Sequence, residues 1–590
     1  MPSVDPNVRR IFTALATGAM VIAGIASRGI PEAAAAPSAA AGPTVRVVYR
    51  MHPNTVVRAA GWLAARGISP ESAAGASSSR QVTPHLSGVD MRAIDVPADK
   101  VDAVLAALKQ RGDLEWAERA TPVRKHGDAT APATAGAPIA TNSITTPTDP
   151  YYSRQWGMAA GGAATAWPRA ATVNAGTAIN VAVVDTGVQV DHPDLVSRLA
   201  PNATWGRCDS GTCLAYASTN ALSIPTDGDG HGTHVAGIIA AATDNAVGVV
   251  GVAGNRPVSI IPVKVLSDNG SGTTDAVAAG ISWAVSKGAK VINLSLGSSA
   301  NTQAINTAID GAVNAGVLVV VSAGNCGGSS WSANGCTSMN SADYPAGYAG
   351  TAAGAGKVIP VAASTSAGGI ASFSTQQGYV ATAGIAAPGD AITSTFNGSS
   401  YASMSGTSMA SPYVAGGAAL VWSTYPSLTR MQVRDVLRAS ATTNATTLAS
   451  PSAFGAGLIN LDAALTAAAV ASGGATPVIG SPTATRTVAP TATRTVLPTA
   501  TQTVVPTATQ TVVPTATRTV APTVTRTVVP TVTRTVAPTA TRTVAPTVTQ
   551  TATKPAAPSA TATKPAASTR TPIPTATPRR PGWWWDGWRR

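Results

Sequence analysis

The stretch VAVVDTG at residues 181–187 is an apolar, β-branched run that ends in an aspartate and a glycine. Such runs are typical of strands that are buried on both faces of a parallel sheet. We predict this strand at residues 179–184, and others at 259–265, 290–294, 317–321 and 358–362. Helical patterns alternate with them, at residues 233–242, 275–287, 301–315 and 408–422. The alternation predicts a three-layer α/β domain with a mainly parallel central sheet over residues 149–470.

Three segments of this domain carry residues that suit catalysis. Asp185 ends the first strand, His231 lies in GHGTHVAG at 230–237, and Ser408 opens an apolar helix in GTSMASP. Each alone has an ordinary explanation, as a turn cap, a packed or metal-bound histidine, or a helix N-cap. Together they supply the nucleophile, the base and the orienting carboxylate that acyl transfer needs. Their chain order also differs from the orders found in α/β-hydrolases and chymotrypsin.

On these segments the chain resembles the subtilisin superfamily, and within it the thermitase-like extracellular enzymes. The resemblance covers about residues 149–464, with a propeptide before them. It implies a subtilisin-like serine endopeptidase in which Asp185 orients His231, His231 is the general base and Ser408 is the nucleophile. By the same resemblance His234 is a structural residue of its helix and takes no part in catalysis.

The resemblance also implies an oxyanion site and a substrate cleft. Asn325 would donate its side-chain amide to the oxyanion beside the backbone N–H of Ser408, although Gly-Asn alone also suits a turn. Substrate-binding positions would be a strand edge that pairs with an extended peptide and the wall of the first specificity pocket: Ser295, Leu296, Gly297, Ser322, Ala323 and Gly324. Because backbone pairing distinguishes few side chains, we expect broad specificity with an apolar or aromatic residue before the cut.

A structural calcium ion is a further implication of the thermitase-like pattern. Its side-chain ligands would come from three polar residues and its carbonyl ligands from the loop that follows: Asp149, Asp194 and Asn245, with Ala242, Val247 and Val249. Mixed carboxylate, amide and carbonyl oxygens suit Ca²⁺. The alternative is a set of ordinary surface polar residues.

The first part of the chain indicates export and an inhibitory propeptide. Arg9 and Arg10 precede an apolar run that is short for a membrane span, so residues 1–36 are predicted to be a signal peptide, with a twin-arginine route left open. Strands at 45–49, 91–96 and 114–118 and helices at 54–66 and 98–111 predict a small α+β, ferredoxin-like propeptide over 44–120. Residues 121–148 are predicted to be a linker that contains the maturation cleavage, somewhere between Ala120 and Thr148.

The end of the chain has a different composition. Residues 481–553 repeat a unit of eight residues with a recurring proline, and they offer few large apolar groups for a core, so we predict a disordered Thr/Pro-rich spacer. Residues 554–590 form a basic tail that ends in WWWDGWRR. Residues 481–590 contain 13 lysines and arginines and one aspartate, whereas residues 149–470 contain 12 lysines and arginines and 15 aspartates. Nucleic-acid binders more often carry their charge on the folded domain, so we expect no nucleic-acid partner.

The four cysteines are Cys208, Cys213, Cys326 and Cys336. In an exported protein they are expected to pair, and the two local bridges, Cys208–Cys213 and Cys326–Cys336, are favoured among three connectivities. Free buried thiols are the alternative. The second bridge would stiffen the loop beside Asn325. An additional loop at residues 204–226 carries the first pair and could border the cleft.

These features favour a secreted, monomeric serine endopeptidase that acts on proteins and matures by cleaving its own propeptide. The propeptide is expected to be an intramolecular inhibitor, and the tail a weak anchor to a cell surface or wall. Two other functions compete with this hypothesis. One is an inactive peptide-binding relative, although no triad or oxyanion residue is missing; the other is a surface scaffold built around the repeat tail.

Overall fold

The computed structural model describes residues 43–52, 80–83, 86, 89–132, 146–208, 213–215, 225–330, 332, 336–443 and 450–473. The chain divides into two compact units, residues 1–487 and 488–590, and every described residue belongs to the first. The predicted signal peptide, the predicted helix at 54–66, the repeat spacer and the Trp-rich tail all lie outside the described residues.

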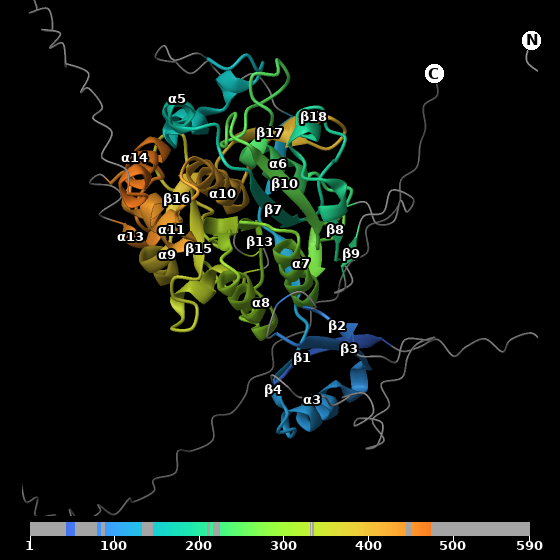
Figure 1. Cartoon of the computed structure of the whole chain (residues 1–590). Coiled ribbons are helices and arrows are strands. Elements are labelled where there is room, and N and C mark those ends of the chain that lie inside the picture. The colour runs from blue at the N-terminus through green and yellow to red at the C-terminus, as the bar shows by residue number, and fades with distance from the viewer. Residues whose placement is uncertain are drawn as a thin grey trace, which may run out of the picture. The chain divides into compact units, whose positions relative to one another are not determined.

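The larger part of the first unit is built on an eight-stranded sheet (Figure 1). Neighbouring strands pair in parallel except for the last two. Their spatial order is β16 (Ile385–Pro388), β15 (Val358–Ser364), β14 (Leu318–Ser322), β12 (Val291–Leu294), β7 (Ile179–Asp185), β10 (Val258–Lys264), β8 (Gly206–Arg207) and β9 (Leu214–Ala215). This arrangement confirms the predicted three-layer α/β domain with a mainly parallel sheet.

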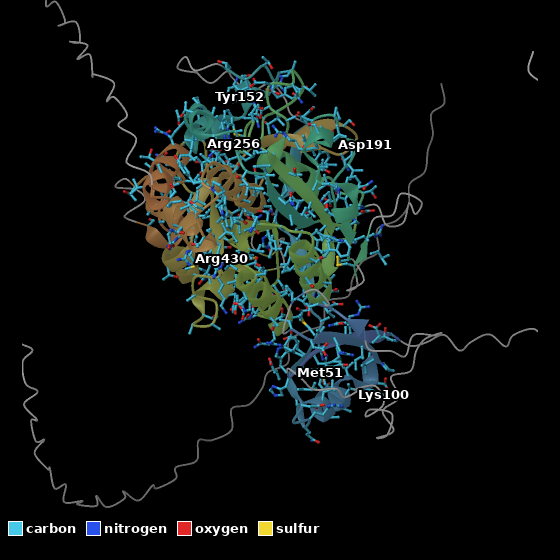
Figure 2. The ribbon with its side chains drawn as sticks, viewed as in Figure 1. Met51, Lys100, Tyr152, Asp191, Arg256 and Arg430 are labelled. Atoms are coloured by element: carbon cyan, nitrogen blue, oxygen red, sulfur yellow. A yellow bond between two sulfur atoms is a disulfide. The ribbon has the colours of Figure 1, made fainter. Side chains whose placement is uncertain are left out.

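Two hydrophobic cores cover the two faces of this sheet. Val181 and Val183 of β7 belong to the core that includes α6 (His231–Ala240) and α10 (Thr407–Thr424). Their neighbours Ala182 and Val184 belong to the core that includes α7 (Thr274–Ser286) and α8 (Gln303–Asn314), which pack side by side (Figure 1). Burial on both faces explains why the strands are continuous apolar runs. The side chains that fill both layers are drawn in Figure 2.

Helix α10 is the centre of its layer. All of its 18 residues are buried, and it contacts strands β12, β14, β15 and β16. Three further helices pack in the same core: α5 (Ala163–Val173), α11 (Arg430–Ala439) and α14 (Leu461–Ala471). Arg256, labelled in Figure 2, is also buried and donates to backbone oxygens of Ala170, Asn174 and Ser423. Helix α10 is therefore held against the sheet by its strand contacts, and Arg256 binds the backbone near its C-terminal end.

The N-terminal part forms a separate antiparallel sheet. Its strand order is β2 (Arg80–Gln81), β3 (Met91–Pro97), β1 (Thr44–Met51) and β4 (Leu114–Arg119), and α3 (Val101–Lys109) packs on it. Arg46 forms a salt bridge with Asp275 of α7 at 2.9 Å. Glu118 accepts hydrogen bonds from the first two backbone N–H groups of α8, at 2.9 and 2.8 Å. This carboxylate caps a helix that lacks a capping side chain of its own.

The start of the predicted linker forms two strands. β5 (Pro122–Lys125) lies between β11 (Ser271–Thr273) and β13 (Leu296–Gly297), antiparallel to both. β6 (Asp128–Pro132) pairs antiparallel with β18 (Ser400–Ser405), which also pairs with β17 (Ile392–Phe396). The predicted linker over residues 121–148 thus begins with two strands, because exposed strand edges supply hydrogen-bond partners that the local sequence does not indicate; residues 133–145 of the linker lie outside the described residues.

Gly232 allows the start of α6 to approach the end of β7. A Cβ at this position would overlap the backbone oxygen of Gly187 and lie 3.2 Å from the Cβ of Asp185. A Cβ added to Gly378, at the start of α9 (Gly378–Ala383), would have open space around it.

We therefore expect Gly232→Ala to lower the free energy of unfolding by about 1–3 kcal/mol, because the helix must move away from the strand. The matched variant Gly378→Ala is expected to stay within about 0.5 kcal/mol of the original protein. Thermal unfolding of the purified proteins measures both, and equal melting temperatures would contradict this account of the packing.

Candidate active site

The predicted catalytic residues lie where the carboxyl ends of the central strands meet two helix starts. Asp185 is the last residue of β7, His231 the first of α6 and Ser408 the second of α10. In a parallel sheet the carboxyl ends of the strands share one edge, where ligands commonly bind. Residues far apart in sequence are therefore brought to the same place.

Asp185 and His231 form a buried pair. The distance between His231 Nδ1 and Asp185 Oδ1 is 2.7 Å, and neither side chain is exposed. The backbone N–H of Thr186 donates to the same carboxylate oxygen at 2.7 Å. Burial would lower the pKa of His231, but the charge of Asp185 and its hydrogen bond outweigh this effect, so the pKa is raised above its ordinary value of 6.5.

Ser408 is buried beside this pair, but its hydroxyl donates to the backbone oxygen of Ser295 at 3.0 Å. The Ser295 hydroxyl in turn donates to the backbone oxygen of Ser408 at 2.9 Å. His231 Nε2 is buried and has no hydrogen-bond partner in the described part of the chain. The hydroxyl–imidazole hydrogen bond needed for proton transfer is thus not formed in this conformation.

Asn325 is oriented by its carboxamide oxygen, which accepts from the backbone N–H of Thr407 at 3.0 Å and from its hydroxyl at 2.9 Å. The amide nitrogen faces the other way. A Cβ added to Gly406 would lie 3.3 Å from Asn325 Nδ2 and 2.6 Å from the backbone oxygen of His126. The Asn325 amide and the His126 carbonyl therefore border the same small space.

A peptide segment of the chain itself runs past these residues. In β5, Arg124 is in register with Gly297 and Ser271, and Lys125 with Leu296. The backbone N–H of His126 donates to the oxygen of Ser295 at 3.3 Å. Beyond Gly127 the chain continues as β6 along β18. The His126–Gly127 bond thus lies between two strand pairings and beside Gly406, as a substrate bond would.

Comparison with known proteins agrees with this geometry. Residues 176–457 match the Subtilase family. The chain is 42% identical to Subtilisin DY of Bacillus licheniformis over 289 residues, which are 49% of this chain and 91% of that protein. It is 42% identical to Thermitase of Thermoactinomyces vulgaris over 277 residues, 47% of this chain and 85% of that protein.

The chain belongs to the subtilase family. The resemblance drawn from the sequence is thereby confirmed, and as a subtilase the protein is a serine endopeptidase. Subtilisin E of Bacillus subtilis strain 168 is a further relative, 40% identical over 289 residues, 49% of this chain and 66% of that protein.

The pocket beside Asn325 holds the His126 side chain in this subtilase. The ring is 4% exposed; its Nδ1 lies 2.8 Å from the hydroxyl of Ser322, and its Nε2 lies 2.8 Å from Asp343 Oδ2. Ser322 ends β14 and is followed by Ala323 and Gly324, the predicted wall residues. A Cβ on Gly324 would lie 2.7 Å from the Cβ of Asp343, so Gly324 and Asp343 are close neighbours.

Asp343 and Asp229 are two acidic residues of the cleft that sequence reasoning missed. Asp343 follows the loop closed by the Cys326–Cys336 bridge, and nothing local distinguishes it from a surface aspartate. Asp229 lies two residues before His231, and this proximity was a usable signal. Its carboxylate oxygens are each 2.8 Å from the Lys125 ammonium nitrogen.

His234 occupies the interior of α6 and is fully buried. Its Nε2 lies 3.0 Å from the oxygen of Ile392 and 3.1 Å from that of Ala402, on β17 and β18. Burial lowers its pKa to about 3, so the ring stays neutral. These contacts give it a structural role between α6 and the β17–β18 hairpin.

The predicted calcium residues form one cluster. Asn245 donates to Asp194 at 2.9 Å, the backbone N–H of Val249 donates to the other Asp194 oxygen at 2.9 Å, and Asp244 N–H donates to Asp149 at 2.9 Å. Ala242 N–H donates to the backbone oxygen of Asp194, and Val247 N–H to the side-chain oxygen of Asn245. The cluster therefore brings together all six predicted positions.

The charges in this cluster fit a bound cation. Asp149 Oδ1 is buried without a hydrogen-bond partner among the described residues. Burial raises the pKa of Asp194 to about 6 and also raises the pKa of Asp149, and the two carboxylates repel one another. A divalent cation bound by oxygens would relieve both the desolvation and the repulsion.

The cysteines of this subtilase form the two local bridges that were favoured. Cys208 pairs with Cys213 and Cys326 with Cys336. The second bridge follows Asn325 directly and lines the cavity next to Asp343. The first belongs to the additional loop, whose β8 and β9 extend the edge of the main sheet.

Proposed function

We propose that this subtilase is a secreted proenzyme that hydrolyses peptide bonds of proteins through an acyl-enzyme intermediate. Ser408 is the nucleophile, His231 the general base and Asp185 the residue that orients His231. Support comes above all from the course of residues 122–132, which run as an extended peptide past the buried Asp185–His231 pair and Ser408.

The proposed reaction begins when the Ser408 hydroxyl leaves the oxygen of Ser295 and turns to His231 Nε2. The imidazole takes the hydroxyl proton as the oxygen attacks the scissile carbonyl, and Asp185 stabilises the imidazolium that forms. The Asn325 amide and the Ser408 backbone N–H stabilise the oxyanion, an interaction whose loss typically costs ~10²–10³ in turnover. His231 then protonates the leaving amine, and water repeats the sequence to release the acid.

We infer that the maturation cut is the His126–Gly127 bond. It falls within the interval 120–148 expected from the sequence, and the segment around it pairs with strands on both sides. Residues 44–126 would then remain as the inhibitory propeptide, and the linker from Gly127 to residue 148 would lead into the catalytic domain at residues 149–470.

We further propose a structural calcium ion and an extracellular location. Asp149, Asp194 and Asn245 would hold the ion with backbone oxygens of Ala242, Val247 and Val249, and the ion would supply the charge that these carboxylates lack. Among the described residues, no helix has both the length and the apolar character that crossing a membrane requires. Monomeric state, the signal peptide at 1–36, the spacer at 481–553 and surface association through 554–590 remain proposals from the sequence.

The Ser408→Ala variant of the full chain is expected to accumulate as uncleaved precursor, whereas the original protein yields a mature form that begins at Gly127. Ser423→Ala is the matched control, because Ser423 is buried in the same helix and its hydroxyl has no described partner; it should mature normally. N-terminal sequencing and intact mass after expression in a protease-deficient host measure both. Maturation of the Ser408→Ala precursor by itself would exclude Ser408 as the nucleophile.

The dependence of kcat/KM on pH is expected to show an acid limb above pH 6.5. His231 accepts a proton only when neutral, and its pKa is raised, so activity is lost as the pH falls through that raised pKa. Asp185→Asn should lower kcat by about 10⁴ and move the acid limb of the residual activity to lower pH, since the charge that raises the pKa is gone. If the acid limb of kcat/KM stays at the same pH in Asp185→Asn, a group other than His231 controls the loss of activity.

Chelation of calcium is expected to lower the melting temperature of the inhibited mature enzyme by about 5 °C, since a ligand at 100 times its dissociation constant stabilises by ~2.7 kcal/mol. Asp194→Asn should melt at the same temperature with and without calcium. Asp191→Asn, a change at an exposed carboxylate of the same loop, should keep the calcium response. No effect of chelation on the original enzyme would rule out this site.

A further inference from the structure

Two carboxylates contact the side chains of Lys125 and His126, the two residues on the N-terminal side of the His126–Gly127 bond. Asp229 contacts Lys125 with both oxygens, at 2.8 Å each, and its side chain is 10% exposed. Asp343 contacts His126 at 2.8 Å and is 7% exposed. The two acids come from different parts of the fold, one from the loop before α6 and the other from the segment after the Cys326–Cys336 loop. Each of the two side chains therefore has its own acidic partner.

The pocket for the residue before the cut has space and a hydrogen-bond acceptor that the His126 ring does not use. Asp343 Oδ1 is buried and has no hydrogen-bond partner in the described part of the chain. It faces Gly297, where an added Cβ would overlap both this oxygen and the His126 ring. A cavity of ≈ 300 Å³ adjoins His126 and Asp343. A longer cationic side chain would have both the space and a second acceptor.

Neither carboxylate is neutralised by the catalytic domain. Within the described residues, Asp229 forms a salt bridge with Lys125 and Asp343 contacts the His126 ring, and no lysine or arginine of residues 149–470 forms a salt bridge with either. When the segment leaves, each carboxylate loses the side chain that it contacts. An apolar side chain in its place would bury that charge unpaired, which is costly.

We propose that this subtilase cleaves after paired basic residues. Asp229 selects lysine or arginine at the second position before the cut, and Asp343 selects lysine, arginine or histidine at the first. This specificity rests on the proposed function and replaces the apolar or aromatic preference expected from the sequence. Val123, two residues before Lys125, is fully buried, so the fourth position before the cut takes an apolar side chain, whereas Arg124 is exposed and its position is unselective.

The first test uses the mature original enzyme and four internally quenched peptides that differ only at the two positions before the cut: Lys-Arg, Lys-Phe, Ala-Arg and Ala-Phe, each preceded by Val-Ala. We expect Lys-Arg to exceed both Lys-Phe and Ala-Arg by about tenfold to hundredfold in kcat/KM, as is typical when a buried charge loses its partner. Equal or faster cleavage of Lys-Phe would overturn the assignment of Asp343, and equal cleavage of Ala-Arg that of Asp229.

The second test assigns each preference to its residue. Asp343→Asn is expected to bring the Lys-Arg to Lys-Phe ratio close to one while the Lys-Arg to Ala-Arg ratio persists; Asp229→Asn should do the reverse. Asp435→Asn, at an exposed carboxylate paired with Arg434, should change neither ratio. Should Asp343→Asn slow maturation, the double variant His126→Phe/Asp343→Asn supplies mature enzyme, because its propeptide then matches its pocket.

Labelling with a fluorophosphonate, which reacts with an activated serine whatever the specificity, separates failure of this inference from failure of the proposed function. If the enzyme is labelled but shows no preference for basic residues, the specificity inference is wrong and the proposed function stands. Asp229 and Asp343 would then serve only to hold the propeptide. An enzyme that neither labels nor cleaves any of the four peptides overturns the proposed function itself.

Discussion

The hydrogen bond between Asp185 and His231 sets the strictest condition on this fold, because it places two ionisable groups where water does not reach. A buried carboxylate is tolerated only when hydrogen bonds or charge compensate its desolvation. Here the compensation comes from the imidazole and from the N–H of Thr186, both at 2.7 Å. The imidazole reaches Asp185 because the end of β7 and the start of α6 lie closely together, which Gly232 permits. The layered α/β core is thus what holds the pair in place.

The same edge of the sheet also bears on how the proposed cleft would bind a peptide and select its side chains. β11 and β13 offer backbone groups to any extended chain, and this pairing carries little information about sequence. Discrimination must then come from groups that the side chains meet on either side of the pairing. In this chain those groups are acids, and each faces a basic side chain of residues 125–126. A fold that gives broad specificity through its backbone can therefore acquire a narrow one through two side chains.

Much of the fold could be predicted from the sequence because the strands and helices carry strong local signals. The apolar runs at 179–184 and 317–321 appear within a residue or two as β7 and β14, and the residues flanking them include Asp185 and Asn325. The peptide strands β5 and β6 could not be predicted. Pro122–Lys125 has two consecutive cationic residues and lacks a strand pattern, and its extended form comes from the edges that pair with it.

The acidic pockets escaped prediction for a related reason. A lone aspartate such as Asp343 has no sequence signature, and its meaning comes only from the side chain that it faces in the fold. The Ser408 hydroxyl is a different case: the sequence pointed to the residue, but in the structure its hydroxyl donates to the backbone oxygen of Ser295 and forms no hydrogen bond with His231. Local sequence specifies which groups reach the site; the conformation of each group depends on what occupies the cleft.

The arrangement of residues 44–132 gives a physical reason for inhibition to outlast the proposed cut. If the His126–Gly127 bond is hydrolysed, residues on the N-terminal side keep the pairing of β5, the salt bridges of Lys125 and His126, and the contacts of Arg46 and Glu118 with α7 and α8. On the C-terminal side, the described residues 128–132 keep the pairing of β6 with β18. The two product segments are thus held very unequally, so the new N-terminus can leave while the propeptide still fills the acidic pockets. Release of activity then depends on removing a folded unit with many contacts, which is a slower and separate event from the chemistry of the cut.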